Sequence, residues 1–263
     1  MRPVAAPPDS QTTMACAALV ERADPDRFAA TMAANPDLRP KLWPLYAFNI
    51  EVARAPWVSQ QPLIAEMRLQ FWRDTLTAAT PRAHDVAAPL HALITQTPGL
   101  APLLDTVIQA RHHDITREPF ASNTAFDAYI EHTSATLMWA AAKTLGAAQD
   151  AETAFRALGW ATGLATYLRA VPDLTARGLQ PLPDASPDAI RTLAAEGLNH
   201  LAIARAQRHL MGAAFPAALP GWQAAGLLKM AHQNPHRVAE GSLALSQFNR
   251  HAQLIWAATT GRL

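Results

Sequence analysis

Few groups of side chains in the chain have a spacing that suits metal binding or acid–base catalysis. Asp127 and Glu131 lie four residues apart, so on a helix their carboxylates share one face and could hold a cation. His112 and His113 precede Asp114, but adjacent helical residues point about 100° apart, which disfavours a shared ion. Because solvated carboxylates and structural histidines are the commoner case, we expect neither group to bind a metal.

Generic catalytic motifs are missing as well. The sequence contains no G-x-S-x-G elbow, no P-loop and no dinucleotide fingerprint. The single cysteine, Cys16, cannot form an intramolecular disulfide or a cysteine-type zinc site, which favours a reducing, cytoplasmic location. With 22 basic and 21 acidic residues the net charge is +1, which argues against nucleic acid as a partner.

The elements that must position any site are helices. Half of the 263 residues are hydrophobic and only 16% are charged, so a large core can form, and runs of alternating β-branched residues are absent. Asp24, Asn35 and Ser186 each precede a proline, the pattern of a helix cap followed by the first helical residue. Helices are predicted at 12–22, 25–34, 37–55, 61–79, 87–97, 99–116, 123–146, 150–177, 187–213, 218–233 and 244–259. Pro44 and Pro172 fall inside two of them and predict kinks or early stops.

The chain is predicted to form a single all-α domain over residues 14–263, preceded by a flexible tail over residues 1–13. That tail has one arginine, an aspartate and three prolines, which differs from a signal or transit peptide. The most apolar stretch, residues 137–142, ends at Lys143 and is far shorter than the ~20 residues of a membrane span.

Two longer stretches are the most informative. The first comprises residues 42–54 and 67–74, with the segments LYAF and RLQFWR; the second is residues 159–183, GWATGLATYLRAVPDLTARGLQPLP. In order and spacing these segments resemble the squalene/phytoene synthase family, from about Ala15 to the C-terminal helix. The resemblance implies a helical isoprenoid-synthase-like bundle around a central apolar cavity, in which the family joins two prenyl diphosphates head to head.

The family's metal site is altered at the matching positions. The resemblance implies two D-x-x-x-D motifs on facing helices, whose carboxylates hold Mg²⁺ against the substrate diphosphate. In this sequence the four positions are Ala53, Trp57, Ala170 and Leu174. Four carboxylates are thus replaced by apolar side chains, so we expect a pseudoenzyme with no catalytic residues, no metal and no cofactor.

Residues 47–53 and 67–72 are more similar still to a divergent branch of the family, which includes a mitochondrial assembly factor for respiratory complex I. This resemblance implies a bacterial relative that helps assemble NADH:quinone oxidoreductase. Its partners would be complex I subunits, and it would be cytoplasmic, in peripheral contact with the inner face of the membrane.

The resemblance also suggests which side chains surround the central cavity, where an isoprenoid or other lipid could bind. The candidate pocket residues are Tyr46, Phe48, Asn49, Arg54, Phe71, Trp72, Tyr167 and Arg169. Each aromatic residue taken singly is more often part of a core. Arg54 and Arg169 keep open a phosphate-bearing ligand held without metal.

Two other functions remain open. A working Mg²⁺-dependent prenyltransferase would need a rearranged site in which at least three carboxylates converge, drawn from Asp114, Glu131, Glu51 and Asp173. An isoprenoid or lipid carrier would need an open cavity and a membrane-facing helix, for which residues 243–263 are the candidate. A terminal helix docked on the core is the commoner interpretation of that segment.

Overall fold

The computed structural model describes residues 10–263, which contain helices and no strand, so the predicted all-α fold is confirmed. Residues 1–9 of the predicted tail lie outside the described residues. Residues 10–13 form the first turn of α1, so the helix begins earlier than the predicted end of that tail. Within the described part of the chain no helix is both long and apolar enough to cross a bilayer.

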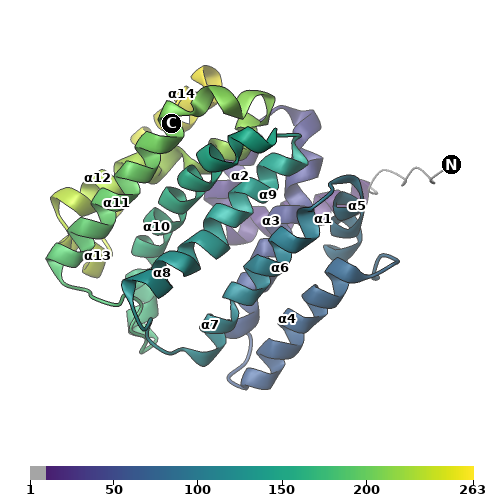
Figure 1. Cartoon of the computed structure of the whole chain (residues 1–263), viewed down its shortest axis with the longest axis horizontal. Helices are drawn as coiled ribbons and strands as arrows, with labels where there is room; N and C mark the ends of the chain where they lie inside the picture. Colours follow the sequence, from purple (N-terminus) through teal and green to yellow (C-terminus); the bar gives the residue numbers. More distant parts are fainter. Residues whose placement is uncertain (1–9) are drawn as a thin grey trace.

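The helices follow one another with short connections (Figure 1). The first half contains α1 (Ser10–Ala23), α2 (Pro25–Met32), η1 (Pro36–Leu38), α3 (Arg39–Arg54), η2 (Ala55–Trp57), α4 (Pro62–Thr77), α5 (Ala87–Gln96), α6 (Leu100–Ala110) and α7 (His112–Thr116). The second half contains α8 (Asn123–Ile130), η3 (Glu131–Ala135), α9 (Thr136–Thr144), η4 (Gln149–Ala151), α10 (Glu152–Ala176), α11 (Pro187–Ala206), η5 (Arg208–Gln223), α12 (Ala224–Gln233), α13 (His236–Ala239) and α14 (Gln247–Thr260).

The predicted caps form. Asp24 Oδ1 accepts a hydrogen bond from the backbone N–H of Arg27 at 3.0 Å, and Asn35 Oδ1 accepts one from Asp37 N–H at 3.0 Å. Ser186 caps α11 in the same way. These local signals therefore place the starts of three elements correctly.

Of the kinks or early stops predicted at proline, the early stops do not occur. Pro44 and Pro172 lie inside α3 and α10, which continue past them. The predicted helix 187–213 instead ends at Ala206, and a non-helical Gly212 with φ of +48° interrupts η5. The predicted helix 99–116 also divides, at Arg111.

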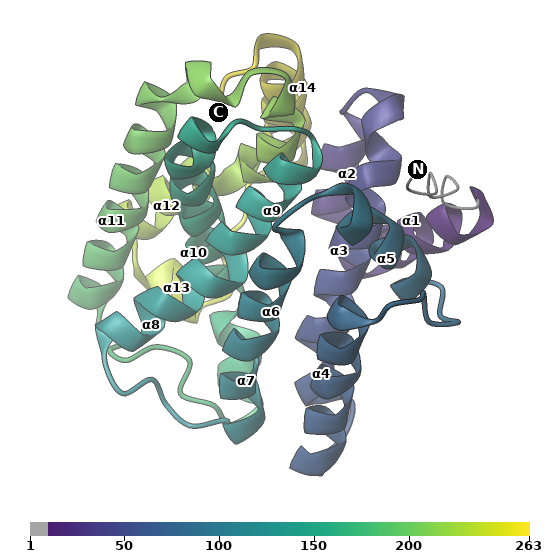
Figure 2. The ribbon, with the colours of Figure 1, turned by 45° about the vertical axis from the view of Figure 1, so that its right-hand side comes forward.

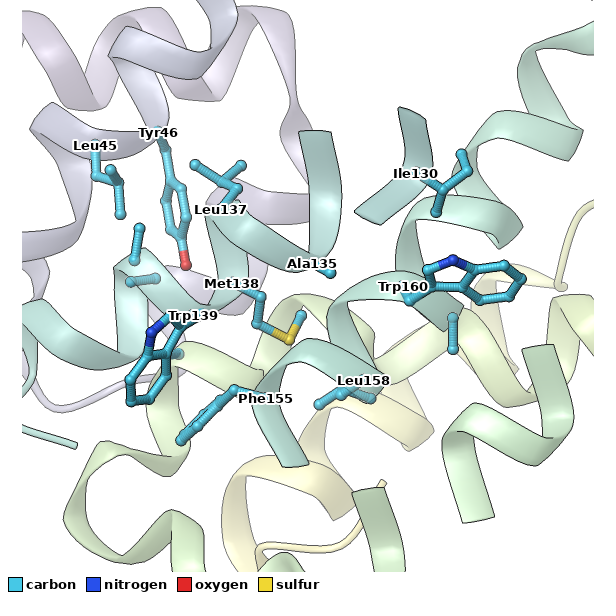
Figure 3. Close-up of a cluster of buried hydrophobic side chains, with 14 of the residues drawn as sticks. Leu45, Tyr46, Ile130, Ala135, Leu137, Met138, Trp139, Phe155, Leu158 and Trp160 are labelled. Atoms are coloured by element: carbon cyan, nitrogen blue, oxygen red, sulfur yellow. The ribbon is translucent and has the colours of Figure 1, made fainter. Parts of the chain in front are cut away.

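The core surrounds α10, which packs against α9, α11, α12 and η5. Trp139, Phe155 and Trp160 are almost fully buried in it (Figure 3). Gly159 and Gly163 allow the π-helical turn η3 to approach α10, because a Cβ on Gly163 would lie 2.3 Å from the Cβ of Ser134. This close contact fixes one wall of the site described next.

Candidate functional site

Two cavities lie next to each other inside the bundle. The first, of about 230 Å³, is bounded by the start of α2 and by α3, η3 and α10. The second, of about 370 Å³, is bounded by the end of α3, η2, α7, α10 and the loop that follows α10. Arg111, Tyr129, Tyr167 and Ala170 line both cavities and so form a shared wall.

The four positions where the sequence lacks carboxylates line the second cavity. Ala53 and Trp57 reach it from α3 and η2, and Ala170 and Leu174 reach it from α10. On α10 the two residues are four apart and share a face, as the sequence spacing requires. The structure therefore brings all four apolar side chains around one space.

Trp57 is held between two arginines of the same cavity. The guanidinium carbons of Arg117 and Arg177 lie 5.5 Å and 5.2 Å from the centroids of its rings, within cation–π range. Arg117 also donates hydrogen bonds to Gln60 Oε1 at 2.9 Å and to the Pro56 carbonyl at 3.4 Å. Two positive charges thus lie at a position where the family pattern has a carboxylate.

A hydrogen-bonded triad occupies the shared wall. Asp114 accepts hydrogen bonds from Arg111 Nη1 at 3.1 Å and from the Tyr129 hydroxyl at 3.0 Å, and Arg111 Nη1 also donates to the Tyr129 oxygen at 2.6 Å. Burial opposes the charge of Arg111, yet Tyr129 and Asp114 hold its pKa above the ordinary value. Burial raises the pKa of Tyr129, so its hydroxyl stays a neutral donor. Arg111 and Asp114 therefore form an ion pair to which Tyr129 is hydrogen-bonded, and none of the three side chains is a free acid or base.

The rearranged carboxylate site does not form. Asp114, Glu118 and Asp173 line the second cavity, but Glu131 pairs with Arg156 at 2.8 Å and Glu51 lies near an arginine on its own helix. Among residues 10–263 no group of three or more His, Cys, Asp or Glu side chains is arranged to hold a metal ion. The donors present therefore do not fit a magnesium–diphosphate cluster.

Three of the eight candidate pocket residues line the cavities. Tyr46 and Asn49 line the first cavity, and Tyr167 lines both. Burial raises the pKa of Tyr46 to about 12, and Asn49 Oδ1 is buried without a hydrogen-bond partner. The Tyr167 hydroxyl donates to the Pro181 carbonyl at 2.9 Å.

The other five lie elsewhere. Phe48, Phe71 and Trp72 form an aromatic cluster between α3 and α4, with the Phe48 and Trp72 rings 5.5 Å apart, and line neither cavity. Phe48 is two residues from Tyr46, so it points about 200° away around α3. Arg54 is exposed near Glu51, and Arg169 donates to Asp26 at 3.0 Å beside a side pocket of about 60 Å³.

The histidines and carboxylates considered from the sequence as metal ligands contact other groups of the protein. The His113 ring stacks on Phe120 with centroids 4.0 Å apart. Asp127 accepts a hydrogen bond from Trp160 Nε1 at 2.7 Å, while Glu131 faces Arg156. His113, Asp127 and Glu131 therefore each contact another side chain of the protein. Asp127 bonds to Trp160 in the core rather than to solvent alone.

Sequence reasoning missed several residues of the cavities. Arg27 lines the first cavity, and its Nη1 and the Nε of Arg111 are buried without partners. The three-residue spacing of Arg111 and Asp114 was a usable signal for their ion pair. No local signal connects Arg117 and Arg177 with Trp57. About sixty residues separate Trp57 from Arg117, and another sixty separate Arg117 from Arg177.

The chain matches a known protein family. The model of the squalene/phytoene synthase family matches residues 20–186. The chain is 31% identical over 167 residues to a Drosophila melanogaster protein named as a homolog of NADH dehydrogenase (ubiquinone) complex I, assembly factor 6, covering 60% of this chain and 50% of that protein. It is 25% identical over 167 residues to assembly factor 6 of Bos taurus, covering 62% and 50%. The chain thus spans about half the length of the curated relatives it matches.

Two solved structures that share the fold are named as synthases. A crystal structure of a dehydrosqualene synthase in complex with ligand has a TM-score of 0.74 at 11% identity, covering 95% of this chain and 96% of that one. Squalene synthase HpnC from Alicyclobacillus acidocaldarius has a TM-score of 0.56 at 16% identity, covering 95% and 94%. At these identities the likeness concerns the fold alone, and it confirms the synthase-like bundle predicted from the sequence.

Proposed function

Because the chain belongs to the squalene/phytoene synthase family, we propose that it is a non-catalytic member that assists assembly of respiratory complex I, the NADH:quinone oxidoreductase. The second cavity carries this proposal. Its wall holds Ala53, Trp57, Ala170 and Leu174, the positions at which the resemblance to the family leads us to expect its four carboxylates. Without those carboxylates the leaving diphosphate of a prenyl transfer has no metal cluster to stabilise its charge.

The relatives support the assembly role. Proteins named as complex I assembly factor 6, from insects and mammals, match up to two thirds of this chain. The proposed partners are therefore subunits of complex I. The proposed location is the cytoplasm, with peripheral contact at the inner face of the membrane that contains the oxidoreductase.

Deletion in the native host tests this role. We expect NADH:quinone oxidoreductase activity of isolated membranes to fall while the content of isoprenoids is unchanged. The full-length chain supplied in trans should restore the activity. Unchanged oxidoreductase activity, or a loss of isoprenoids, would contradict the proposal.

Purified protein tests the absence of prenyl transfer. We expect no condensation of farnesyl or geranylgeranyl diphosphate with or without Mg²⁺. A quadruple variant, Ala53→Asp, Trp57→Asp, Ala170→Asp and Leu174→Asp, restores the carboxylates and tests whether the rest of the site is competent. Product formed by the unaltered protein at a rate that rises with Mg²⁺ would establish the alternative, a working prenyltransferase.

The cavities favour one addition to this role, an isoprenoid or other lipid ligand. The first cavity combines apolar side chains such as Ile130, Leu137 and Met138 with the unpartnered Asn49. Extraction of the purified protein followed by mass spectrometry should yield a stoichiometric ligand. The variant Met138→Trp should reduce its amount by filling the cavity, and equal amounts from both proteins would contradict a ligand at this position.

A further inference from the structure

The helix α14 has apolar residues on two opposite faces. Its inner face packs on η5, with Leu254 and Ala257 in a small apolar cluster. Its outer face exposes Phe248, Ile255 and Trp256, whose exposed fractions are 80%, 64% and 56%. At 100° per residue, Phe248 and Ile255 lie within about 20° of each other and opposite Ala257, and Trp256 lies about 100° from Ile255, at the edge of the outer face. An ordinary docked terminal helix would be polar on that outer face.

The C-terminal part of the chain, which includes α14, is basic. Residues 197–263 contain six lysines and arginines and one acidic residue, Glu240, although the whole chain has a net charge of +1. Arg205 donates to the main-chain oxygen of Leu263 at 2.6 Å and Arg208 to that of Gly261 at 2.8 Å, so both lie at the C-terminal end of α14. Arg262 is exposed beside them.

One acidic side chain of another element pairs with α14. Asp26 at the start of α2 pairs with Arg250 on the inner side of α14 and with Arg169. Partial burial raises the pKa of Asp26, but its contacts with the two arginines lower it. The result is a pKa below the ordinary value for an aspartate. Asp26 therefore shares its charge between Arg250 and Arg169. Arg205 bonds to the terminal main-chain oxygen of Leu263, and neither Arg208 nor Arg262 pairs with an aspartate or glutamate among the ion pairs of residues 10–263.

A second exposed apolar patch provides a comparison. On α4, Leu63 and Met67 are 66% and 64% exposed, but Glu66 lies between them and Arg68 follows, so the charges there are mixed. Figure 2 shows α4 and α14 on different sides of the bundle. Among the exposed large hydrophobic residues of the described chain, the aromatic ones, Phe248 and Trp256, both lie on α14, close to the arginines at its C-terminal end.

We propose that the outer face of α14 docks on an anionic lipid surface. Phe248, Ile255 and Trp256 insert into the interface, where tryptophan is favoured, while arginines at the C-terminal end contact lipid phosphates. A second copy of this chain is a poor occupant, because two such faces would bring like charges together. The inference rests on the peripheral membrane contact of the proposed function and names the surface that makes it, and vesicle binding tests this surface independently of complex I assembly.

Vesicle flotation of the full-length protein tests the inference. We expect binding to phosphatidylcholine vesicles that contain about 30 mol% phosphatidylglycerol, weakened by salt, and little binding to phosphatidylcholine alone. The double variant Phe248→Ser/Ile255→Ser should lower the partition coefficient by about tenfold or more. The matched control Leu63→Ser/Met67→Ser on α4 should leave it unchanged.

Two further measurements locate the contact. Brominated lipids should quench the fluorescence of Trp256, and the variant Trp256→Phe should lose that quenching. Arg262→Gln should lower binding to the anionic vesicles several-fold, whereas Arg68→Gln should not.

Several outcomes would overturn the inference. These are no binding to anionic vesicles, an equal loss in both double variants, and quenching that persists without Trp256. A dimer in light scattering that the α14 double variant dissociates, in a protein that ignores vesicles, would assign the face to a second copy instead. Circular dichroism of each variant confirms that the exposed substitutions leave the fold intact.

Discussion

Asp114→Asn is the most informative change at the wall between the two cavities. The substitution keeps the size of the side chain and removes the charge that faces Arg111 and accepts the Tyr129 hydroxyl hydrogen bond. The Asp114 and Arg111 side chains are 13% and 17% exposed, so the variant leaves a largely buried guanidinium without its counter-charge.

The magnitude follows from that burial. Removing one partner of a buried ion pair costs about 3–5 kcal/mol, and the remaining exposure of both groups places this pair at the lower end, about 3 kcal/mol. For a chain of this size that corresponds to a fall in Tm of roughly 6–12 °C. Tyr129→Phe, which removes one hydroxyl from the triad, should cost about 1–2 kcal/mol. The double variant should lose less than the sum, because both changes act on one network.

Urea denaturation followed by circular dichroism measures these free energies of unfolding. The control is Asp105→Asn, which makes the same chemical change in an ion pair with Arg73 at 2.8 Å whose side chains are 33% and 41% exposed. A surface pair of this kind contributes about 0.2–1 kcal/mol. The reasoning is refuted if Asp114→Asn costs no more than Asp105→Asn.

Three further predictions follow from burial and close packing. Gly163→Ala should lower the free energy of unfolding by about 1–3 kcal/mol in urea titrations, because its Cβ would lie 2.3 Å from the Cβ of Ser134. The control Gly226→Ala should be near neutral, since its new atom meets only the flexible ends of side chains. Burial raises the pKa of Cys16 from 9.0, and of Tyr46 from 10.0, to about 12, so their contribution to stability is complete below about pH 9 and is lost as the pH rises towards 12. Cys16→Ala and Tyr46→Phe should each flatten the alkaline fall in stability, and curves parallel to that of the unaltered protein would contradict this. Trp57→Ala should cost about 1–2 kcal/mol in the same titrations because it removes contacts with two guanidinium groups, and a neutral result would show that these contacts do not stabilise the fold.

The positions of helices could be predicted because their signals are local. Asp24 and Ser186 cap the helices that they precede, as their side-chain chemistry requires. The breaks could not be predicted as well, since they depend on tertiary packing. Pro172 remains within α10 because the surrounding elements hold that helix. Gly212 interrupts η5 through a positive φ that no neighbouring residue in the sequence predicts.

The residues of the candidate site could be predicted where the spacing along one helix determines which side chains share a face. The four-residue spacing of Ala170 and Leu174 places both on one cavity wall, and the family pattern relates them to Ala53 and Trp57. Which aromatic residues face a cavity depends on how the helices rotate against each other. Phe71, for this reason, packs with its neighbour on α4 instead of lining the site.

The backbone at Arg117 has a conformation that is unusual for a residue with a side chain. Its φ of 55° makes it the sole non-glycine residue with a left-handed conformation in the described chain, a state that costs about 1 kcal/mol or more. Its side chain contacts Trp57, Gln60 and Pro56. These contacts join segments about sixty residues apart in sequence at one side of the second cavity.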